Sequence, residues 1–186
     1  MAEHVCPWWL GYLLASPVRR WITEKPELML GPYVQEGMTV LEPGPGMGFF
    51  TLPLAQMVGP SGRVVAVDIQ PKMIASLERR AQKAGFLERL DLRNAAADQL
   101  MVTDLNGKID FALAFAVVHE TPSAERFFHQ VAAALKPGGV VFFAEPSGHV
   151  KPASFDAELE AARQAGLQVV GQPSVRRSHA AALQKA

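Results

Sequence analysis

The sequence has almost no cysteine and no excess of either charge. Cys6 is the single cysteine among 186 residues, which excludes an intrachain disulfide and fits a reducing compartment, so we expect a cytoplasmic protein. Basic and acidic residues number 18 each, giving a formal net charge of zero. This balance gives no electrostatic footprint for nucleic acid or for an anionic membrane, and we predict neither as a partner.

The sequence also lacks long apolar runs, repeats and low-complexity segments. The apolar stretch near the N-terminus is interrupted by Pro7 and Pro17 and is too short to cross a bilayer. No basic region precedes it, so a signal peptide is not expected. Hydrophobic residues make up 49% of the chain, which is enough for the core of one domain of ordinary size.

From Gly37 onward, short apolar runs alternate with helical patterns. Apolar strands without polar alternation are typical of a parallel sheet that is covered on both faces. Strands are predicted in residues 38–43, 63–69, 89–95, 108–115 and 140–146, and helices in 48–58, 71–85, 123–139 and 154–166. This alternation predicts an α/β fold with a doubly wound, Rossmann-like and mostly parallel sheet.

The last two predicted strands, 167–175 and 178–184, lie too close together for a helical crossover. We therefore expect a C-terminal antiparallel hairpin at the edge of the sheet. No linker of domain-separating length is visible, so we predict a single domain over residues 1–186. It would consist of an N-terminal helical extension, 1–36, as a possible lid, and a Rossmann-like core, 37–186.

The stretch LEPGPGMGFF, residues 41–50, lies between the first predicted strand and the helix after it. Gly44, Gly46 and Gly48 would let the backbone approach a ligand closely, because they carry no side chain. The start of the following helix offers free N–H groups and the positive end of its dipole. The loop therefore predicts a ligand with an anionic group, at the carboxyl end of the strands.

Asp68 closes the second predicted strand, twenty positions beyond Gly48. A carboxylate at this position can accept two hydrogen bonds from a ribose diol. Together with the glycine loop, it predicts a cofactor of the adenosine type, although either motif alone would be weak. The alternative is that Asp68 only caps the helix that starts near Pro71.

The identity of the cofactor follows from the spacing of the loop. A nicotinamide loop reads G-x-G-x-x-G, but here Phe49 stands where the third glycine would be, and a P-loop would need Gly-Lys-Ser/Thr. Glu42, two positions before the first glycine, would repel a pyrophosphate and suit an ammonium group. A ligand with an ammonium, a carboxylate, a ribose and a sulfonium fits the whole set, and this ligand is S-adenosyl-L-methionine.

At this point the sequence resembles a known family, the class I S-adenosylmethionine-dependent methyltransferases of the small-molecule type, close to those of quinone biosynthesis. The resemblance runs in order from Met38 to Pro146, and the terminal hairpin extends it. Its motifs are VLEPGPGMG, GRVVAVDIQPKMI, IDFALAFAVVHE and LKPGGVVFFAEP. It implies an enzyme that transfers a methyl group to a small-molecule acceptor. A cofactor-binding module or partner subunit without catalysis is the alternative.

The resemblance also implies roles for individual residues. Glu42 and the glycine loop would hold the methionine end of the cofactor, and Asp68 the ribose. The remaining cofactor-binding residues that it implies, mostly around the adenine, are Ile69, Met73, Ala97, Asp98 and Phe115. The sequence departs from the family pattern at Pro43 and Pro45, which stiffen the first loop, and at Ala96, where the family often has an acidic residue.

The methyl group is already activated by the sulfonium, so an acid or base is needed only when the acceptor must lose a proton. His119 and Glu120 follow the fourth core strand and are the candidate catalytic residues; the alternative is that they only stabilise the loop. Glu145 and His149, after the fifth strand, would face the same open end of the sheet, with His149 as a candidate substrate residue.

The N-terminal segment would supply further substrate residues if it covers the site. His4, Trp8 and Trp9 are the candidates there, and the alternative is that the aromatic residues only pack against the sheet. His4, Cys6, His119 and His149 have side chains of the kinds that bind zinc or copper. Because nothing in their spacing requires a metal, we predict none. The sequence does not indicate an oligomeric state.

Overall fold

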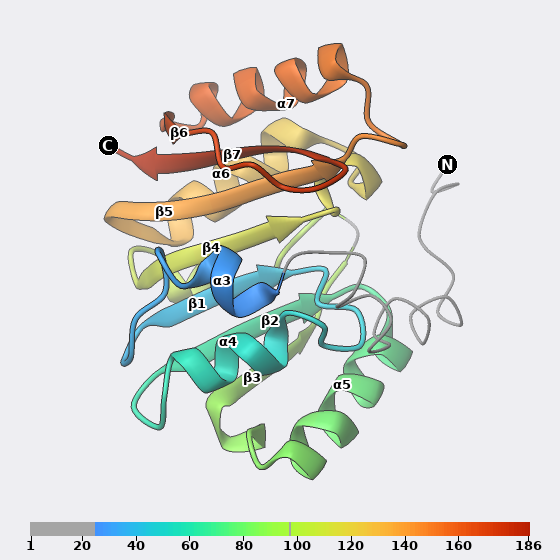
Figure 1. Ribbon diagram of the computed structural model, residues 1–186, viewed down its shortest axis with the longest axis vertical. Helices are drawn as coiled ribbons and strands as arrows, with labels where there is room; N and C mark the ends of the chain where they lie inside the picture. The colour runs from blue at the N-terminus through green and yellow to red at the C-terminus, as the bar shows by residue number, and fades with distance from the viewer. Residues whose placement is uncertain (1–24, 97) are drawn as a thin grey trace. The chain divides into compact units, whose positions relative to one another are not determined.

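The computed structural model of the protein describes residues 25–96 and 98–186. The described residues form two compact units, whose boundary in the chain lies between Ala95 and Ala96, and Figure 1 shows the strands and helices of each. Among the described residues, no helix has both the length and the apolar character needed to cross a membrane.

The first unit is built on three parallel strands, β1 (Thr39–Pro43), β2 (Arg63–Asp68) and β3 (Leu90–Asn94), in the order β3-β2-β1. Residues 64–68 of β2 are all buried, as expected for a strand without polar alternation. Glu42 lies opposite Ala66 in the register, so the acidic residue of β1 is close to the carboxyl end of its neighbour.

The helices of the first unit follow the pattern expected from the sequence. They are α3 (Pro26–Leu30), α4 (Thr51–Met57) and α5 (Pro71–Ala84), followed by the short helix η1 (Leu87–Arg89). In Figure 1, α3 and α4 lie in front of β1 and β2. Proline at the first position of α5 and Gly85 after its end give it a defined start and stop.

The second unit contains β4 (Ile109–Phe115), β5 (Leu135–Pro146), β6 (Leu167–Gly171) and β7 (Ser178–Lys185), in the order β4-β5-β7-β6. β4 and β5 are parallel, whereas β7 is antiparallel to both β5 and β6. The expected C-terminal hairpin is therefore confirmed. β6 forms the edge, and β7 lies between β5 and β6.

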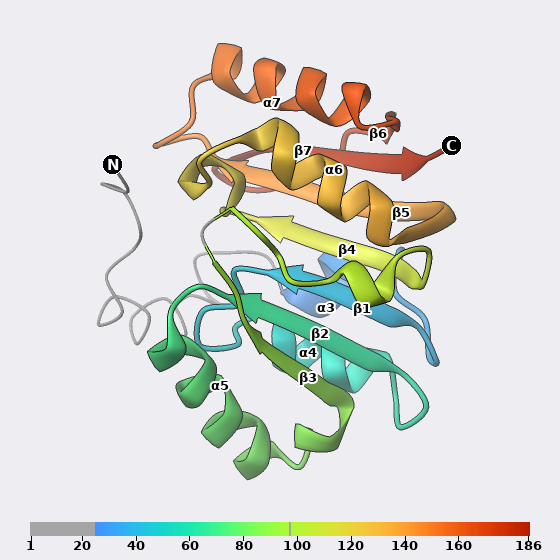
Figure 2. The ribbon, with the colours of Figure 1, turned by 180° about the vertical axis from the view of Figure 1, so that it is seen from behind.

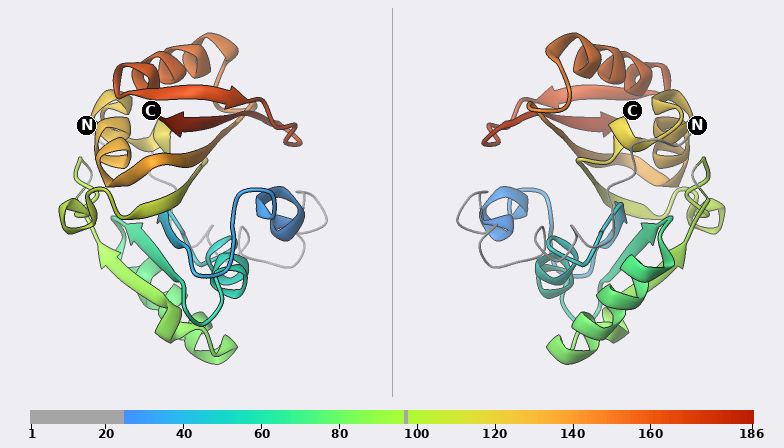
Figure 3. Two further views of the ribbon diagram at one scale, coloured as in Figure 1. Left: turned by 90° about the vertical axis from the view of Figure 1, so that its left-hand side faces the viewer. Right: turned by 90° about the vertical axis from the view of Figure 1, so that its right-hand side faces the viewer.

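The helices of the second unit are η2 (Thr103–Leu105), η3 (Val118–Glu120), α6 (Ala124–Ala134) and α7 (Pro152–Gln164). α6 and α7 pack against each other, and α7 also packs against β6. Figure 2 shows α6 in front of the strands of this unit, and Figure 3 shows α7 running along the β6–β7 hairpin. The Ser123 hydroxyl caps α6 by accepting the N–H of Arg126 at 3.1 Å.

The largest error in the predicted boundaries lies between α6 and β5. The helix α6 was expected to continue to the Pro-Gly pair, but it ends at Ala134, and β5 already begins at Leu135. Pro137 disfavours the helical region at the residue before it, so the chain becomes extended ahead of the proline. The core of this unit is rich in phenylalanine: Phe143 stacks on Phe155 at 4.9 Å, and its other ring partner is Phe128, edge-on at 5.2 Å.

Gly48 has a packing role that its place in the glycine loop did not reveal. A Cβ atom at this position would lie 2.5 Å from Cδ1 of Leu77, which is fully buried on α5. Gly48 also has φ +87°, a backbone conformation that favours glycine. It therefore allows the loop to lie directly against α5.

We predict that Gly48→Ala lowers the free energy of unfolding by roughly 2–4 kcal/mol, since it adds overpacking to backbone strain. Gly85→Ala is the matched control, because Gly85 has φ +75° and nothing lies within 4 Å of where its Cβ atom would be. The control should cost only the strain, about 1 kcal/mol. Urea unfolding of both variants measures the difference, and equal losses would contradict a close contact with Leu77.

Candidate functional site

The carboxyl ends of β1 and β2 bring the predicted cofactor residues of the first unit together. Glu42 and Asp68 are both buried, with 3% and 8% of their surface exposed. The N–H of Gly46 donates to Oδ2 of Asp68 at 3.3 Å, which ties the glycine loop to the end of β2. Two carboxyl groups and a loop of free backbone thus meet at one edge of the unit's sheet.

Glu42 has a buried oxygen atom that lacks a partner. Among the described residues, none forms a hydrogen bond with its Oε2. Burial raises the pKa of Glu42 from 4.5 to about 8, the neighbouring Thr51 hydroxyl lowers it, and the charge of Asp68 raises it further. Because an unpaired buried acceptor is costly, the geometry fits a ligand that brings a positively charged donor to this oxygen.

Asp68 is better satisfied than Glu42. Its Oδ1 accepts the N–H of Gln70 at 2.8 Å, and its backbone carbonyl accepts the N–H of Ala95 at 3.0 Å. Burial raises the pKa of Asp68 to about 6, while the backbone N–H groups, that of Gln70 first, lower it. Gln70 and not Asp68 is the N-cap residue of α5, so Asp68 organises the turn before the helix without capping it.

The glycine loop has left-handed backbone at all three glycines, with φ +68° at Gly44, +54° at Gly46 and +87° at Gly48. No described residue has an atom within 4 Å of where a Cβ atom of Gly46 would be, so this part of the loop is open with respect to the described chain. The carbonyl of Met47 accepts a hydrogen bond from Nη1 of Arg80 on α5. The role of Arg80 could not be predicted from the sequence, because Met47, whose carbonyl it contacts, lies 33 positions earlier in the chain.

Ile69 and Met73, the expected adenine contacts, differ in exposure. Ile69 follows β2 and is 38% exposed, which is unusual for a large apolar side chain in this protein. Met73, in the first turn of α5, is buried at 4% exposure. Ile69 is thus available to pack on a flat apolar ligand.

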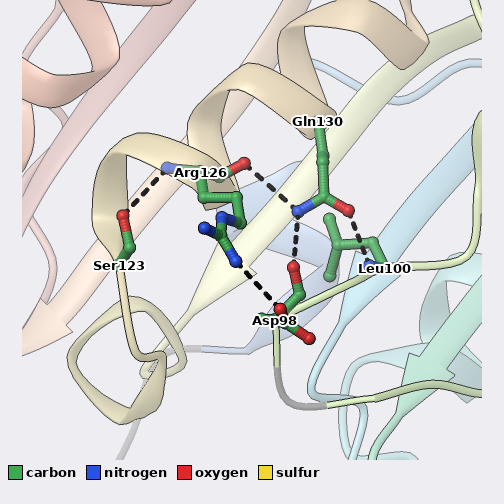
Figure 4. A network of polar contacts seen from close by, with 5 residues as sticks. All are labelled: Asp98, Leu100, Ser123, Arg126 and Gln130. Carbon is green, nitrogen blue, oxygen red and sulfur yellow. Dashed lines mark hydrogen bonds and ion pairs between the residues drawn. The ribbon is translucent and has the colours of Figure 1, made fainter.

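In the second unit, Asp98 pairs with α6. Its carboxylate forms an ion pair with Arg126 at 2.8 Å, and its backbone carbonyl accepts the side-chain amide of Gln130 at 3.1 Å (Figure 4). Gln130 also accepts the N–H of Leu100 at 2.8 Å, which holds the loop to the helix. The expected role of Asp98 in adenine binding stays a prediction, and Ala97 lies outside the described residues.

His119 is held by a buried carboxylate from the neighbouring strand. Nδ1 of His119 lies 2.5 Å from Oε2 of Glu145, which is fully buried near the end of β5. The other oxygen, Oε1, accepts the backbone N–H groups of Val118 at 2.7 Å and His119 at 3.3 Å. The hydrogen bond to Glu145 raises the pKa of His119, which burial partly offsets.

The other candidates beyond β4 and β5 lie around this pair. His149 is exposed, and its ring centroid is 6.1 Å from that of His119. Glu120, the last residue of η3, raises the pKa of His119 by its charge. Phe115 is the final residue of β4 and pairs with Ala144 in the register. The structure thus brings His119 and His149 together, while the roles of Glu120 and Phe115 stay predictions.

Glu158 on α7 was missed by the sequence analysis. Among the described residues, none forms a hydrogen bond with its Oε2, which is buried. Burial raises the pKa of Glu158 to about 7, the charge of Glu145 raises it further, and His119 lowers it. The spacing along the chain gave no signal for Glu158, because α7 is brought to this place only by its packing in the second unit.

Four residues of the sequence analysis cannot be placed here. His4, Cys6, Trp8 and Trp9, and with them the possible lid, lie outside the described residues. Within residues 25–96 and 98–186, no group of three or more His, Cys, Asp or Glu side chains could hold a metal ion.

Comparisons with known proteins agree with this geometry. The family described as "Methyltransferase domain" matches residues 40–139. The arsenite methyltransferase of Halobacterium salinarum is 34% identical over 105 residues, covering 56% of this chain and 26% of that protein. The ubiquinone biosynthesis O-methyltransferase of Paramagnetospirillum magneticum is 33% identical over 114 residues, covering 61% and 42%. The chain thus spans less than half the length of these curated relatives.

The fold is shared with a solved structure. A SAM-dependent methyltransferase from Aquifex aeolicus is similar with a TM-score of 0.86 and 21% identity, covering 98% of this chain and 100% of that chain. This likeness confirms the fold class expected from the sequence, a doubly wound, Rossmann-like sheet that is mostly parallel and has a C-terminal antiparallel hairpin.

We predict that Glu42→Gln stabilises the ligand-free protein at pH 8. The pKa of Glu42 is higher in the folded chain than in the unfolded chain. From pH 4.5 to about 8 the unfolded chain loses this proton while the folded chain keeps it, so the free energy of unfolding falls as pH rises. This pKa change corresponds to at most about 5 kcal/mol. Thermal unfolding at pH 4 and pH 8 measures the effect, which should vanish at pH 4. A variant that is less stable at pH 8 would contradict an unpaired buried carboxyl.

Proposed function

Because this chain belongs to the methyltransferase domain family, of the class I S-adenosylmethionine-dependent kind, we propose that it transfers a methyl group from S-adenosylmethionine to a small-molecule acceptor. S-adenosylmethionine is the cofactor of this family. The observation that carries the proposal is the buried oxygen of Glu42, which has no hydrogen-bond partner among the described residues and lies beside the glycine loop. An ammonium group provides the charged donor that this oxygen lacks.

Three parts of the first unit would hold the cofactor. Glu42 would accept the ammonium of the methionine end, and the free backbone around Gly46 would lie along the same end. Asp68 would accept hydrogen bonds from the ribose diol with the lone pairs that Gln70 and Gly46 leave free. The exposed side chain of Ile69 would pack on the adenine. These residues lie within one unit, so they are arranged before the cofactor binds.

When bound, the cofactor supplies an activated methyl group, so the protein's task is alignment and the exclusion of water. The second unit carries the groups suited to the acceptor. His119 follows the carboxyl end of β4, and Glu145 lies one position before the carboxyl end of β5; ligands of doubly wound folds bind beyond such strand ends. We assign acceptor chemistry to these two residues, with His149 beside them.

The class of acceptor is supported by the names of the relatives. They include an arsenite methyltransferase and a ubiquinone biosynthesis O-methyltransferase, whose names point to small molecules. Nothing in the structure favours a cofactor-binding module without catalysis over an enzyme. We propose a cytoplasmic enzyme for which neither nucleic acid nor a membrane is the substrate.

Calorimetric titration with three ligands tests the proposal. We expect S-adenosylmethionine and S-adenosylhomocysteine to bind with similar affinity, since both carry the ammonium and the ribose diol, and NAD to bind at least 100-fold more weakly. The reason is that Glu42 would face a pyrophosphate in NAD. Glu42→Gln should weaken both adenosyl ligands by roughly 10-fold or more, the usual worth of a charged hydrogen bond. Comparable binding of NAD would overturn the proposal.

A further inference from the structure

We propose that Glu145 is a positioning residue that presents His119 as a general base, and that the methyl acceptor is therefore a hydroxyl group, which a phenol can test. This inference rests on the proposed methyl transfer and goes further by naming the acceptor atom. Three contacts to one buried carboxyl group of the second unit, that of Glu145, support it.

The contacts of Glu145 define its direction. Its Oε1 accepts two backbone N–H groups of η3, and its Oε2 lies within hydrogen-bond distance of Nδ1 of His119. We infer that Oε2 likewise accepts, from a proton on Nδ1. The backbone contacts also hold η3 at the end of β5. Glu145 therefore positions both the backbone and the ring of His119.

The same contacts define the tautomer of His119. Since Glu145 accepts at Nδ1, the neutral ring carries its proton there and has a lone pair on Nε2. Among the described residues, no hydrogen bond to Nε2 is present, and the side chain is 21% exposed. Nε2 is therefore available to a ligand. A carboxylate, an imidazole and a free Nε2 form the arrangement that removes a proton from a hydroxyl group in many enzymes.

The charges around His119 also favour its protonated form. Glu145 on β5, Glu120 on η3 and Glu158 on α7 all raise the pKa of His119, and the exposed His149 lies against its ring. A base with a raised pKa binds a proton more tightly, so it removes the proton of the methyl acceptor more readily, provided that it starts in its unprotonated form. The base form is present above that pKa, so transfer should increase as pH rises through it.

The proton that the acceptor must lose indicates its kind. A thiol ionises readily near neutral pH and needs little help. A hydroxyl group keeps its proton at this pH and gains most from a positioned histidine, and a phenolic hydroxyl, with a pKa near 10, is the most readily deprotonated kind. In the step, the hydroxyl oxygen forms the bond to the methyl carbon, and the carbon–sulfur bond breaks with its electron pair on sulfur. The hydroxyl proton passes to Nε2 of His119.

The exposure of His119 provides a route for that proton to leave. Its side chain is 21% exposed, so the imidazolium can return its proton to water after each transfer.

The first test measures the tautomer of His119 without any acceptor. Nitrogen-15 NMR of histidine-labelled full chain with S-adenosylhomocysteine should show a proton on Nδ1 and a pKa above 6.5, assigned with His119→Gln. Glu145→Gln can still accept the two backbone N–H groups but turns an N–H group toward Nδ1. It should therefore move the ring proton to Nε2 and lower the pKa.

Glu160→Gln is the matched control, because Glu160 is an exposed residue whose ion-pair partner is Arg163 on the same helix. It should leave the histidine spectrum unchanged. A proton on Nε2 in the wild type, or an unchanged titration in Glu145→Gln, would overturn the positioning role. If Glu145→Gln does not fold, the wild-type tautomer decides the question alone.

The second test measures transfer of labelled methyl from S-adenosylmethionine to 3,4-dihydroxybenzoate and, separately, to arsenite with glutathione. We expect methylation of the phenol, with kcat rising with pH through the pKa of His119. Glu145→Gln should lower kcat roughly 100-fold or more, the usual worth of a general base, while the KM for the cofactor changes less than about 2-fold.

The outcomes separate the two proposals. Lack of cofactor binding would overturn the proposed function itself. Cofactor binding without methylation of the phenol, with or without methylation of arsenite, would leave that function standing and overturn the hydroxyl acceptor. Equal kcat in the wild type and Glu145→Gln would overturn the role of Glu145.

Discussion

The first unit depends on one unsatisfied interaction, the buried carboxyl of Glu42. Burial raises its pKa to about 8, and its Oε2 has no partner among the described residues. The chain places it there because β1 is buried along most of its length and the glycine loop begins directly after it. A folded protein tolerates such a cost where a ligand removes it. The open space at Gly46 and the strand-end Asp68 are the matching features beside it.

The second unit shows the opposite arrangement. Glu145 is as deeply buried as Glu42, but two backbone N–H groups and the ring of His119 satisfy it before any ligand binds. A carboxylate whose hydrogen bonds are made within the protein can hold its neighbour in position. A buried carboxyl oxygen without a donor can instead accept one from a ligand. This physical difference is why we assign cofactor binding to Glu42 and the orientation of His119 to Glu145. Both residues stand one position before the end of a parallel strand.

Much of the fold could be predicted from local patterns, because buried parallel strands and short connections leave clear signals. The apolar strands, the proline start of α5 and the C-terminal hairpin were all readable in this way. The contacts of the site were not. The contact of Glu145 with His119 spans 26 positions, and Asp98 meets Arg126 across 28. The packing of Gly48 on Leu77 likewise depends on how α5 crosses the strands, which no spacing in the loop reveals.

The number of protons exchanged on cofactor binding tests the central claim most directly. Calorimetry at pH 6.5 in buffers of different ionisation enthalpy measures this number. At this pH the carboxyl of Glu42 is mostly protonated in the free protein, and an ammonium group at its oxygen would favour the ionised form. The account predicts that about one proton is released when S-adenosylmethionine binds and that Glu42→Gln abolishes this release. Binding without proton release in the wild type, or with the same release in Glu42→Gln, would contradict it.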